Sequence, residues 1–299
     1  MATFTRPDGR VVYPLDNEYH LRSDESEFYK AQTGITDDAA LEQHIRAVQK
    51  EAYAVFPYNC IRRFNFVTLK ISRHPIYQDV LKLGKERPGA ILLDIGCCFG
   101  NDARKAVADG YPIDQVLGSD LRPEFWELGH KLFKTTVDSF PVPFLAGDVF
   151  DPAFIAPAKP AIDRLNGATP DLSTLASLTP LTHRISAIHA SSFFHLFNEE
   201  QQHVVAEKLA ALLSPEPGSV IFGSHMGAFQ KGDRLNGVGR AIFAHSEDSW
   251  KDLWDGDIFP KGKVEVSTSL KQVDRNTTGV SGPDGARIAH LLVYSIRRL

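Results

Sequence analysis

The sequence has few cysteines, no long apolar run and no excess of positive charge, and each shortage argues against a class of protein. Three cysteines in 299 residues are a sparse and odd set, which favours a reduced, cytoplasmic chain over one held by disulfides. No stretch of about 18 apolar residues occurs and the start is polar, so we expect neither a membrane span nor a signal peptide. The formal net charge of -4 argues against nucleic acid as a partner.

The first 85 residues are predicted to form a helical cap. Residues 23–34 are acidic and weakly patterned, which indicates a loosely helical arm. After Asp37, a good N-cap residue, apolar residues recur at helical spacing and predict an amphipathic helix. Two more helices are predicted over residues 60–71 and 74–84. Because these helices precede the first predicted strand, we expect them to enclose a ligand on the domain that follows.

Residues 86–299 alternate between apolar runs of strand length and helical stretches, which indicates βαβ units and a mostly parallel, doubly wound α/β sheet. The predicted strands, the fourth with its exit loop, are at residues 90–96, 115–120, 143–150, 185–197 and 218–226. The predicted helices are at residues 101–110, 123–136 and 199–213, with one or two short ones within 152–184. At the end, alternating runs at 264–273 and 287–296 flank the turn-rich segment 274–286 and predict an antiparallel hairpin.

Acidic residues and a tight glycine turn follow the first three predicted strands. Gly96 and Gly100 come directly after the first strand, where a ligand can approach the backbone. Asp120 ends the second strand 24 residues after Gly96, where an adenosine ribose presents its hydroxyl groups. Asp148 ends the third strand, where it can accept a hydrogen bond from an adenine amino group while Val149 contacts the ring. The pattern predicts an adenosine-containing cofactor.

The turn itself discriminates between two such cofactors. A dinucleotide oxidoreductase needs Gly-x-Gly-x-x-Gly to hold a pyrophosphate, whereas this turn reads Gly-Cys-Cys-Phe-Gly. Asp94 lies two residues before the first glycine and would repel a diphosphate. A carboxylate there suits S-adenosylmethionine (SAM), which carries an ammonium group and a sulfonium. The sequence therefore favours a methyltransferase over an oxidoreductase.

These residues carry a family resemblance. The acidic residues at three successive strand ends, followed by a terminal hairpin, resemble the class I SAM-dependent methyltransferases with their Rossmann-like fold. More narrowly, the wording LLDIGCCFG, FWELGHKLF, ASSFFHLF and HSEDSWKDLW, with GITDDAALEQHI and PYNCIRRFNF upstream, is similar to the fungal meroterpenoid O-methyltransferases of secondary metabolism. The resemblance also implies a homodimer.

The resemblance implies a set of cofactor contacts. They are Gly96 and Cys97 for the methionine portion, Asp120 and Leu121 for the ribose, and Asp148 and Val149 for the adenine. Cys98 departs from the family pattern, because it stands where the middle glycine of Gly-x-Gly-x-Gly is usual, so its side chain must point away from the cofactor. The adjacent cysteines could instead bind a metal or react as a redox pair, but no second pair and no histidines at ligand spacing accompany them. We expect no metal.

In this fold the loop after the fourth strand faces the transferred methyl group. We predict that Ser191 lies there beside the cofactor and that His195 is a general base or orients a carboxylate. His225, after the fifth strand, is the second candidate base, whereas His189 is expected to be structural. The candidate contacts for an apolar substrate are Phe194, Met226, Phe229, Trp250 and Trp254, the two tryptophans being equally consistent with a core position.

The predicted activity is SAM-dependent O-methylation of a bulky, apolar secondary metabolite, by resemblance the carboxylate of a polyketide-terpenoid acid. A carboxylate is ionised at pH 7 and needs no base, so alignment for in-line displacement would suffice. Methylation of a phenol or alcohol would require a histidine base, and C-methylation an activated carbon. A SAM-binding regulator without catalytic activity is the alternative from another class.

Overall fold

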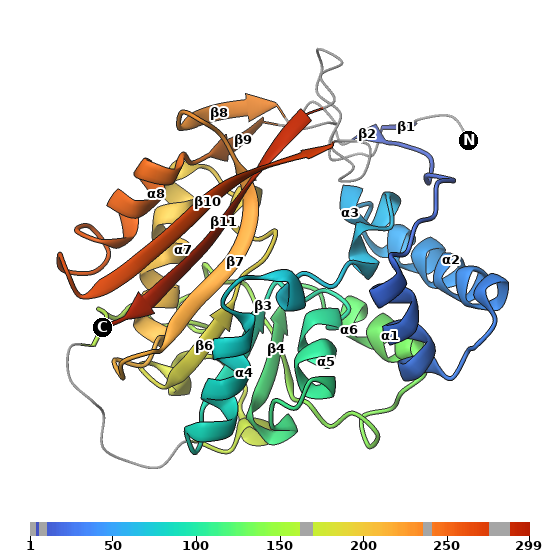
Figure 1. Ribbon diagram of the computed structural model, residues 1–299, viewed down its shortest axis with the longest axis horizontal. Helices are drawn as coiled ribbons and strands as arrows, with labels where there is room; N and C mark the ends of the chain where they lie inside the picture. Colours follow the sequence, from blue (N-terminus) through green and yellow to red (C-terminus); the bar gives the residue numbers. More distant parts are fainter. Residues whose placement is uncertain (1–3, 6–10, 162–169, 236–240, 275–287) are drawn as a thin grey trace.

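A twisted seven-stranded sheet runs through the protein, with helices on both faces (Figure 1). The computed structural model describes residues 4–5, 11–161, 170–235, 241–274 and 288–299. The strands of the sheet are β3 (Ile91–Ile95), β4 (Val116–Asp120), β5 (Phe144–Ala146), β6 (Ile185–His189), β7 (Val220–Gly227), β10 (Val264–Asp274) and β11 (Ile288–Arg298). Their order across the sheet is β10-β11-β7-β6-β3-β4-β5.

The order of the strands creates a switch point between β3 and β6. The chain runs from β3 outward to β4 and β5, then crosses back to β6 and β7, and all of these strands are parallel. Strand β11 pairs antiparallel with β7, and β10 with β11. The expected Rossmann-like α/β fold with a terminal antiparallel pair is confirmed, although most of the turn expected at 274–286 lies outside the described residues. Ligands of such sheets bind beyond the carboxyl ends of the strands at the switch point.

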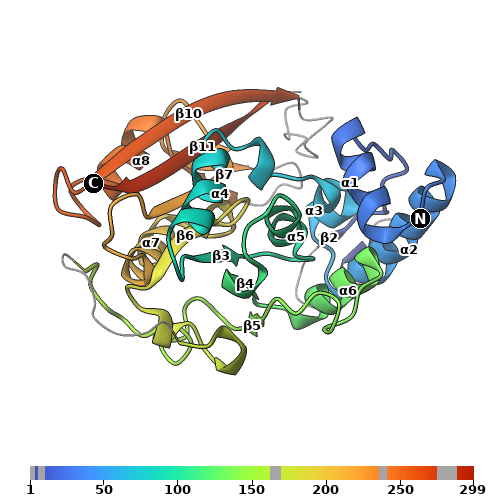
Figure 2. The same cartoon turned by 60° about the horizontal axis from the view of Figure 1, so that its bottom comes forward.

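The helices divide into two layers and a cap. They are α1 (Ser23–Thr33), α2 (Asp38–Val55), α3 (Asn59–Arg62), α4 (Tyr77–Glu86), α5 (Asn101–Ala108), α6 (Pro123–Phe133), α7 (Glu199–Leu212) and α8 (Glu247–Trp254). Helices α7 and α8 share one apolar core with the sheet, and α4 and α5 share another on its opposite face (Figure 2). The expected division of the chain at residue 85 stays a prediction.

The cap formed by α1 to α3 lies beyond α5 and α6 and is attached to both. Helix α6 turns Trp126 toward the sheet and Phe125 and Phe133 toward the cap. Asn101, the first residue of α5, donates a buried hydrogen bond of 2.7 Å to the hydroxyl of Tyr29 in α1. The cap is therefore packed directly on the helix that follows the glycine turn.

Two local predictions differ from the structure. Residues 60–71 do not form one helix, because Phe64 adopts a left-handed backbone with φ of 60° and a 3-10 turn follows at Asn65–Val67. Phe64 and Phe66 are both buried, and residues two apart cannot face the same side of an α-helix. The loosely helical arm is a regular helix, α1, which ends at the left-handed Gly34.

Two short antiparallel pairs escaped the sequence patterns. Strands β1 (Phe4–Thr5) and β2 (Val11–Val12) pair near the N-terminus. Strands β8 (Gly232–Leu235) and β9 (Ala241–Ala244) form a hairpin between β7 and α8. Among the described helices, none has the length and apolar character needed to cross a bilayer.

Candidate cofactor and active site

The glycine turn after β3 has the conformation that its sequence predicts. Gly96 and Gly100 adopt φ angles of +69° and +70°, in the left-handed region that favours glycine. A Cβ on Gly96 would lie 2.7 Å from a ring carbon of Phe193, and one on Gly100 would lie 2.4 Å from a ring carbon of Trp126. Both positions therefore exclude a side chain on steric as well as conformational grounds.

Asp120 holds this turn from the end of the neighbouring strand. Its Oδ2 accepts a hydrogen bond of 2.9 Å from the backbone N–H of Cys98, and its Oδ1 accepts one of 3.1 Å from Arg122. Cys98 has a φ of 50°, which aims its N–H at the carboxylate. Burial raises the pKa of Asp120, and the two N–H groups oppose that shift. The carboxylate is thus fixed at the edge of β4 with lone pairs left for further donors.

Asp94 shares a hydrogen bond with His189, which was expected from the sequence to be structural. Its Oδ1 lies 2.8 Å from Nδ1 of His189, at the ends of the adjacent strands β3 and β6. Both residues are almost fully buried, with exposed fractions of 3% and 1%. Burial alone would lower the pKa of His189, but the hydrogen bond and charge of Asp94 outweigh it and raise that pKa above its usual value. Nε2 of His189 is buried without a hydrogen-bond partner.

The other predicted cofactor residues surround this edge in different ways. Leu121 is 55% exposed although it is apolar, so its side chain is available to a ligand. Asp148 is exposed, and its Oδ1 accepts a hydrogen bond from the N–H of Phe150. Val149 is buried in the core on the α7 side and does not present a free surface to an adenine ring.

Both cysteines of the turn point away from the open edge. Cys97 is buried in the core on the α4 and α5 side, and Cys98 packs against the cap. The side chain of Cys98 thus points away from the turn, as the family departure requires. Ser191 is half-buried, and its hydroxyl accepts a hydrogen bond of 3.3 Å from the N–H of Ser224 in β7. Cys97 could contact a cofactor through its backbone only.

Comparison with known proteins now identifies the family. A family model described as the meroterpenoid methyltransferase N-terminal domain matches residues 13–67. The Asnovolin E/Chermesin D methyltransferase nvfJ of Aspergillus novofumigatus is 34% identical over 233 residues, which cover 77% of this chain and 72% of that protein. This chain belongs to the fungal meroterpenoid methyltransferases. The family uses SAM, so the protein is a SAM-dependent methyltransferase and the expected cofactor is confirmed.

Other relatives agree with this membership. O-methyltransferase phiE of a fungal species is 33% identical over 214 residues, 70% of this chain, although the match spans only 63% of phiE. Methyltransferase ausD of Penicillium brasilianum is 32% identical over 259 residues, 86% of this chain and 82% of that protein. Among solved structures, a Burkholderia thailandensis 1,6-didemethyltoxoflavin-N1-methyltransferase with bound S-adenosylhomocysteine covers 100% of both chains, with 14% identity and a TM-score of 0.44.

The residues at the carboxyl edge of the methyltransferase sheet fit SAM. Gly96 lets the ring of Phe193 pack directly on the turn, where a side chain would clash with it. Asp120 is oriented by two backbone donors while retaining acceptor capacity for ribose hydroxyls. Leu121 offers an exposed apolar surface beside it. Asp94 places a carboxylate next to the turn, where an ammonium group would be stabilised.

The structure corrects several of the predicted substrate and catalytic residues. His225 is 1% exposed, and its ring lies against those of Phe194, Trp250 and Tyr294. Burial lowers its pKa well below the usual value, and both ring nitrogens lack hydrogen-bond partners. His225 is therefore a neutral core residue, not a base that a substrate can reach. Phe194, Trp250 and Trp254 are each 0% exposed, so they belong to the core and not to a substrate wall.

The remaining candidates lie at the surface or close to it. His195 is half-buried in a 3-10 turn, Phe194–Leu196, just after β6. Met226 is half-buried near the end of β7, and Phe229 beyond it is 78% exposed with its ring 4.6 Å from that of His290. Phe194 was the predicted substrate contact, yet it is Phe193 whose ring lies over Gly96.

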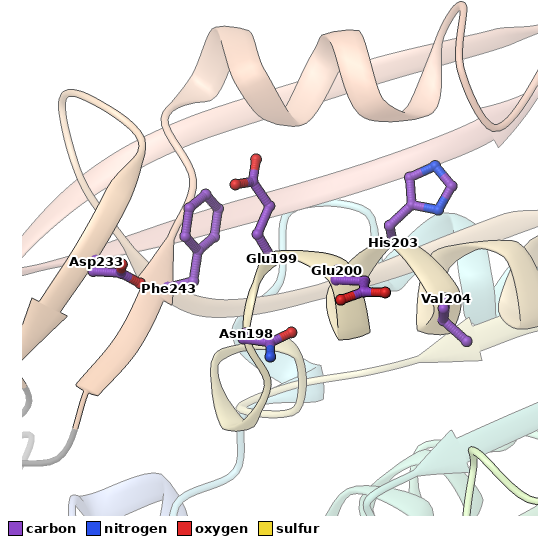
Figure 3. Close-up of a pocket in the computed structure, with 7 residues that line it drawn as sticks. All are labelled: Asn198, Glu199, Glu200, His203, Val204, Asp233 and Phe243. Carbon is purple, nitrogen blue, oxygen red and sulfur yellow. The ribbon is translucent and has the colours of Figure 1, made fainter.

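A cavity of about 740 Å³ opens between the hairpin β8–β9 and the start of α7 (Figure 3). Asp233 and Phe243 of the hairpin line one side, and Glu199, Glu200 and His203 of α7 line the other, with Asn198 and Val204. None of the predicted cofactor or substrate residues lines this cavity. Glu199 is paired with Lys231 at 3.1 Å, which leaves Glu200 and Asp233 to repel an acidic ligand. We therefore do not assign the methyl acceptor to it.

Proposed function

We propose that this methyltransferase transfers the methyl group of SAM to the carboxylate of a bulky, apolar secondary metabolite. The acceptor would bind above the carboxyl ends of β6 and β7, next to the turn at Gly96. The product would be a methyl ester.

The observation that carries this proposal is the state of the three histidines near these strand ends. His225 is buried among aromatic rings, and His189 is engaged by Asp94. His195 is the one that the described structure leaves partly exposed. A carboxylate is already ionised at neutral pH and needs no proton acceptor, which suits an edge with so little basic machinery.

The apolar surface around this edge supports a bulky acceptor. Leu196, in the turn after β6, is 37% exposed, and Phe229, after β7, is 78% exposed. Leu235 at the end of β8 is 50% exposed. Exposed apolar side chains near a catalytic edge are typical of sites for apolar ligands.

Two of the relatives add support through their names. The name of nvfJ states that it is a methyltransferase for asnovolin E or chermesin D, and phiE is named an O-methyltransferase. An acceptor of comparable kind, a secondary metabolite methylated on oxygen, is consistent with 33–34% identity to these proteins.

When bound, SAM would supply a methyl group on a sulfonium: an in-line attack by the acceptor's carboxylate oxygen would form the C–O bond as the C–S bond breaks, with S-adenosylhomocysteine as the leaving group. The protein's own contribution is alignment and exclusion of water. Asp94 would hold the ammonium group of the cofactor, and Asp120 its ribose. Phe193 covers the turn at Gly96 and limits the access of water from the side of β6.

Product analysis with a panel of apolar acids, phenols and alcohols tests the proposal. Each compound is incubated with the protein and SAM, and the product is analysed by mass spectrometry before and after treatment with base. We expect base-labile methyl esters from acids. Base-stable products from phenols or alcohols would point to the alternative reaction, and a base-stable C-methyl product would refute O-methylation.

Methylation of a phenol or alcohol is the second candidate, because His195 lies on the loop expected to face the methyl group. His195→Gln separates the two. With a carboxylate acceptor we expect kcat to change less than about threefold and to keep its pH profile. Loss of a general base would lower kcat about 100- to 10,000-fold. SAM binding without turnover of any acceptor would favour the regulator.

A further inference from the structure

Lys70 lies in the segment that joins the cap to α4, and its backbone is held by the helix that follows the glycine turn. The backbone N–H groups of Lys70 and Ile71 donate hydrogen bonds of 2.8 Å and 2.9 Å to Oδ1 of Asp102. Asp102 is the second residue of α5, which begins directly after Gly100. The main chain at Lys70 is thus tied to the start of the helix that follows the cofactor turn.

The side chain of Lys70 is half-buried and has no counter-ion. Within the described residues, no carboxylate forms a salt bridge with its ammonium group, and no hydrogen bond to it is found. A partly desolvated cation without a partner is unfavourable, and a bound anion would relieve that cost.

The charge of Lys70 acts on the residues of the turn. Burial raises the pKa of Asp94 and of Cys98, and the positive charge of Lys70 opposes the shift at both. The same charge opposes the rise in the pKa of Cys60 in the cap, and it also disfavours protonation of His189. Lys70 thus acts on groups of β3, of the turn, of β6 and of the cap. Its backbone, held by Asp102 at the start of α5, places the residue beside the turn from which that helix begins.

We propose that Lys70 binds the carboxylate of the methionine portion of SAM. The inference rests on the assignment of the cofactor to this edge. That portion of SAM is a zwitterion, with an ammonium group and a carboxylate on the same carbon. Asp94 from the sheet and Lys70 from the segment between the cap and α4 present the two complementary charges. The segment that carries Lys70 then completes the cofactor site.

The test compares two ligands in matched variants. Binding of SAM and of decarboxylated SAM, which lacks only the carboxylate, is measured by calorimetry for the full chain. The wild-type protein should prefer SAM over decarboxylated SAM. In Lys70→Met the dissociation constant for SAM should rise about 10- to 100-fold, as expected for loss of a charged hydrogen bond. The constant for decarboxylated SAM should stay within about twofold, and Lys70→Arg should restore most of the preference for SAM.

Lys82→Met is the matched control, because Lys82 lies on α4 with 67% of its side chain exposed. It should bind both ligands as the wild type does. Equal weakening of both ligands in Lys70→Met would mean a structural role and overturn the inference, and so would unchanged SAM binding. Asp120→Ala separates a failure of the cofactor-site assignment from a failure of the role of Lys70. If it loses SAM while Lys70→Met does not, the site stands and only the role of Lys70 fails. If Asp120→Ala still binds SAM tightly, the site assignment fails and the inference with it.

Discussion

The buried pair of Asp94 and His189 should make SAM binding depend on pH. The two side chains share a hydrogen bond of 2.8 Å, and the charge of Asp94 raises the pKa of His189 above its usual value of 6.5. If the ammonium group of SAM binds at Asp94, it competes with the proton that this pair holds. A proton bound by the free protein and lost on binding means that affinity rises with pH. We expect tight binding above the raised pKa of His189 and weaker binding as pH falls through it.

The size of the effect follows from geometry and Coulomb's law. A cation on the far oxygen of Asp94 would lie roughly 7 Å from the protonated imidazole. Two like charges at that distance repel by about 2.4 kcal/mol at an effective dielectric constant of about 20. This energy corresponds to a change of about 50-fold in the dissociation constant between the fully protonated and deprotonated pair.

Other charged groups near His189 should contribute little to this change. Burial, above all, lowers the pKa of the neighbouring His74 to about 4, so that it stays neutral over the working range. Lys70 and Asp102 act on His189 in opposite directions. One titrating unit is therefore expected. Calorimetry in two buffers of different ionisation enthalpy should show a release of up to about 0.7 proton on binding, the maximum that a 50-fold change in affinity allows.

His189→Asn supplies the decisive comparison, since its amide N–H can still donate to Asp94 but does not titrate. We expect this variant to bind SAM with an affinity that is flat across the same pH range. A wild-type affinity that is already flat, or a His189→Asn variant that keeps the full pH dependence, would refute the reasoning. Either result would mean that Asp94 does not receive the ammonium group or that another residue titrates.

Three further predictions concern the residues that hold the site in place. Gly96→Ala should weaken SAM binding and lower stability by more than about 1–2 kcal/mol in denaturant melts, because it adds a clash to an unfavourable backbone conformation. The control is Gly34→Ala, where the φ is similar but nothing lies within 4 Å of the added Cβ. It should show the backbone cost alone and leave SAM binding unchanged. Gln202→Leu should lower stability by about 2–3 kcal/mol and speed hydrogen exchange in β9, because the backbone carbonyls of Phe197 and of Phe243 in β9 lose the buried amide donor of Gln202. The control Gln201→Ala, at an exposed neighbour, should lower stability by less than about 1 kcal/mol. Asp102→Ala should destabilise the protein by about 2–3 kcal/mol and weaken SAM binding, because the backbone N–H groups of Lys70 and Ile71 lose their acceptor. Asp102→Asn keeps one acceptor oxygen and should lose less stability and less SAM affinity. Equal losses in both variants would contradict the role of Asp102 as that acceptor.

The fold was predictable because its signals are local. Apolar runs bounded by glycine and proline marked β3, β4, β6 and β7, and alternating runs at the end marked β10 and β11. The segment at residues 60–71 was not predictable from spacing, because the cap needs both Phe64 and Phe66 buried and the chain bends to allow it. The hairpin β8–β9 is too short and too polar in β8 to give a strand pattern.

The candidate site divides in the same way. The sequence pattern predicted the positions of Gly96, Gly100 and Asp120, because strand ends and turn glycines can be recognised from sequence alone. The sequence did not predict the hydrogen bond between Asp94 and His189, because the two residues are 95 positions apart and meet only through the pairing of β3 with β6. Nor could sequence decide which of two adjacent phenylalanines faces the turn. That choice depends on the 3-10 turn after β6, which sends Phe194 into the core and leaves Phe193 over Gly96.

Three histidines close to parallel strand ends illustrate why residue type alone does not assign catalysis. Burial without a polar partner makes His225 a neutral part of an aromatic core. Burial beside a carboxylate gives His189 a raised pKa and a place in cofactor binding if Asp94 contacts SAM. Partial exposure on the loop after β6 distinguishes His195 from the two buried histidines, and its role toward an acceptor stays a prediction. Because the neighbouring groups separate the three, a mutation of His195 should change kcat less than about threefold with a carboxylate acceptor, while one of His189 should change the pH dependence of the affinity for SAM.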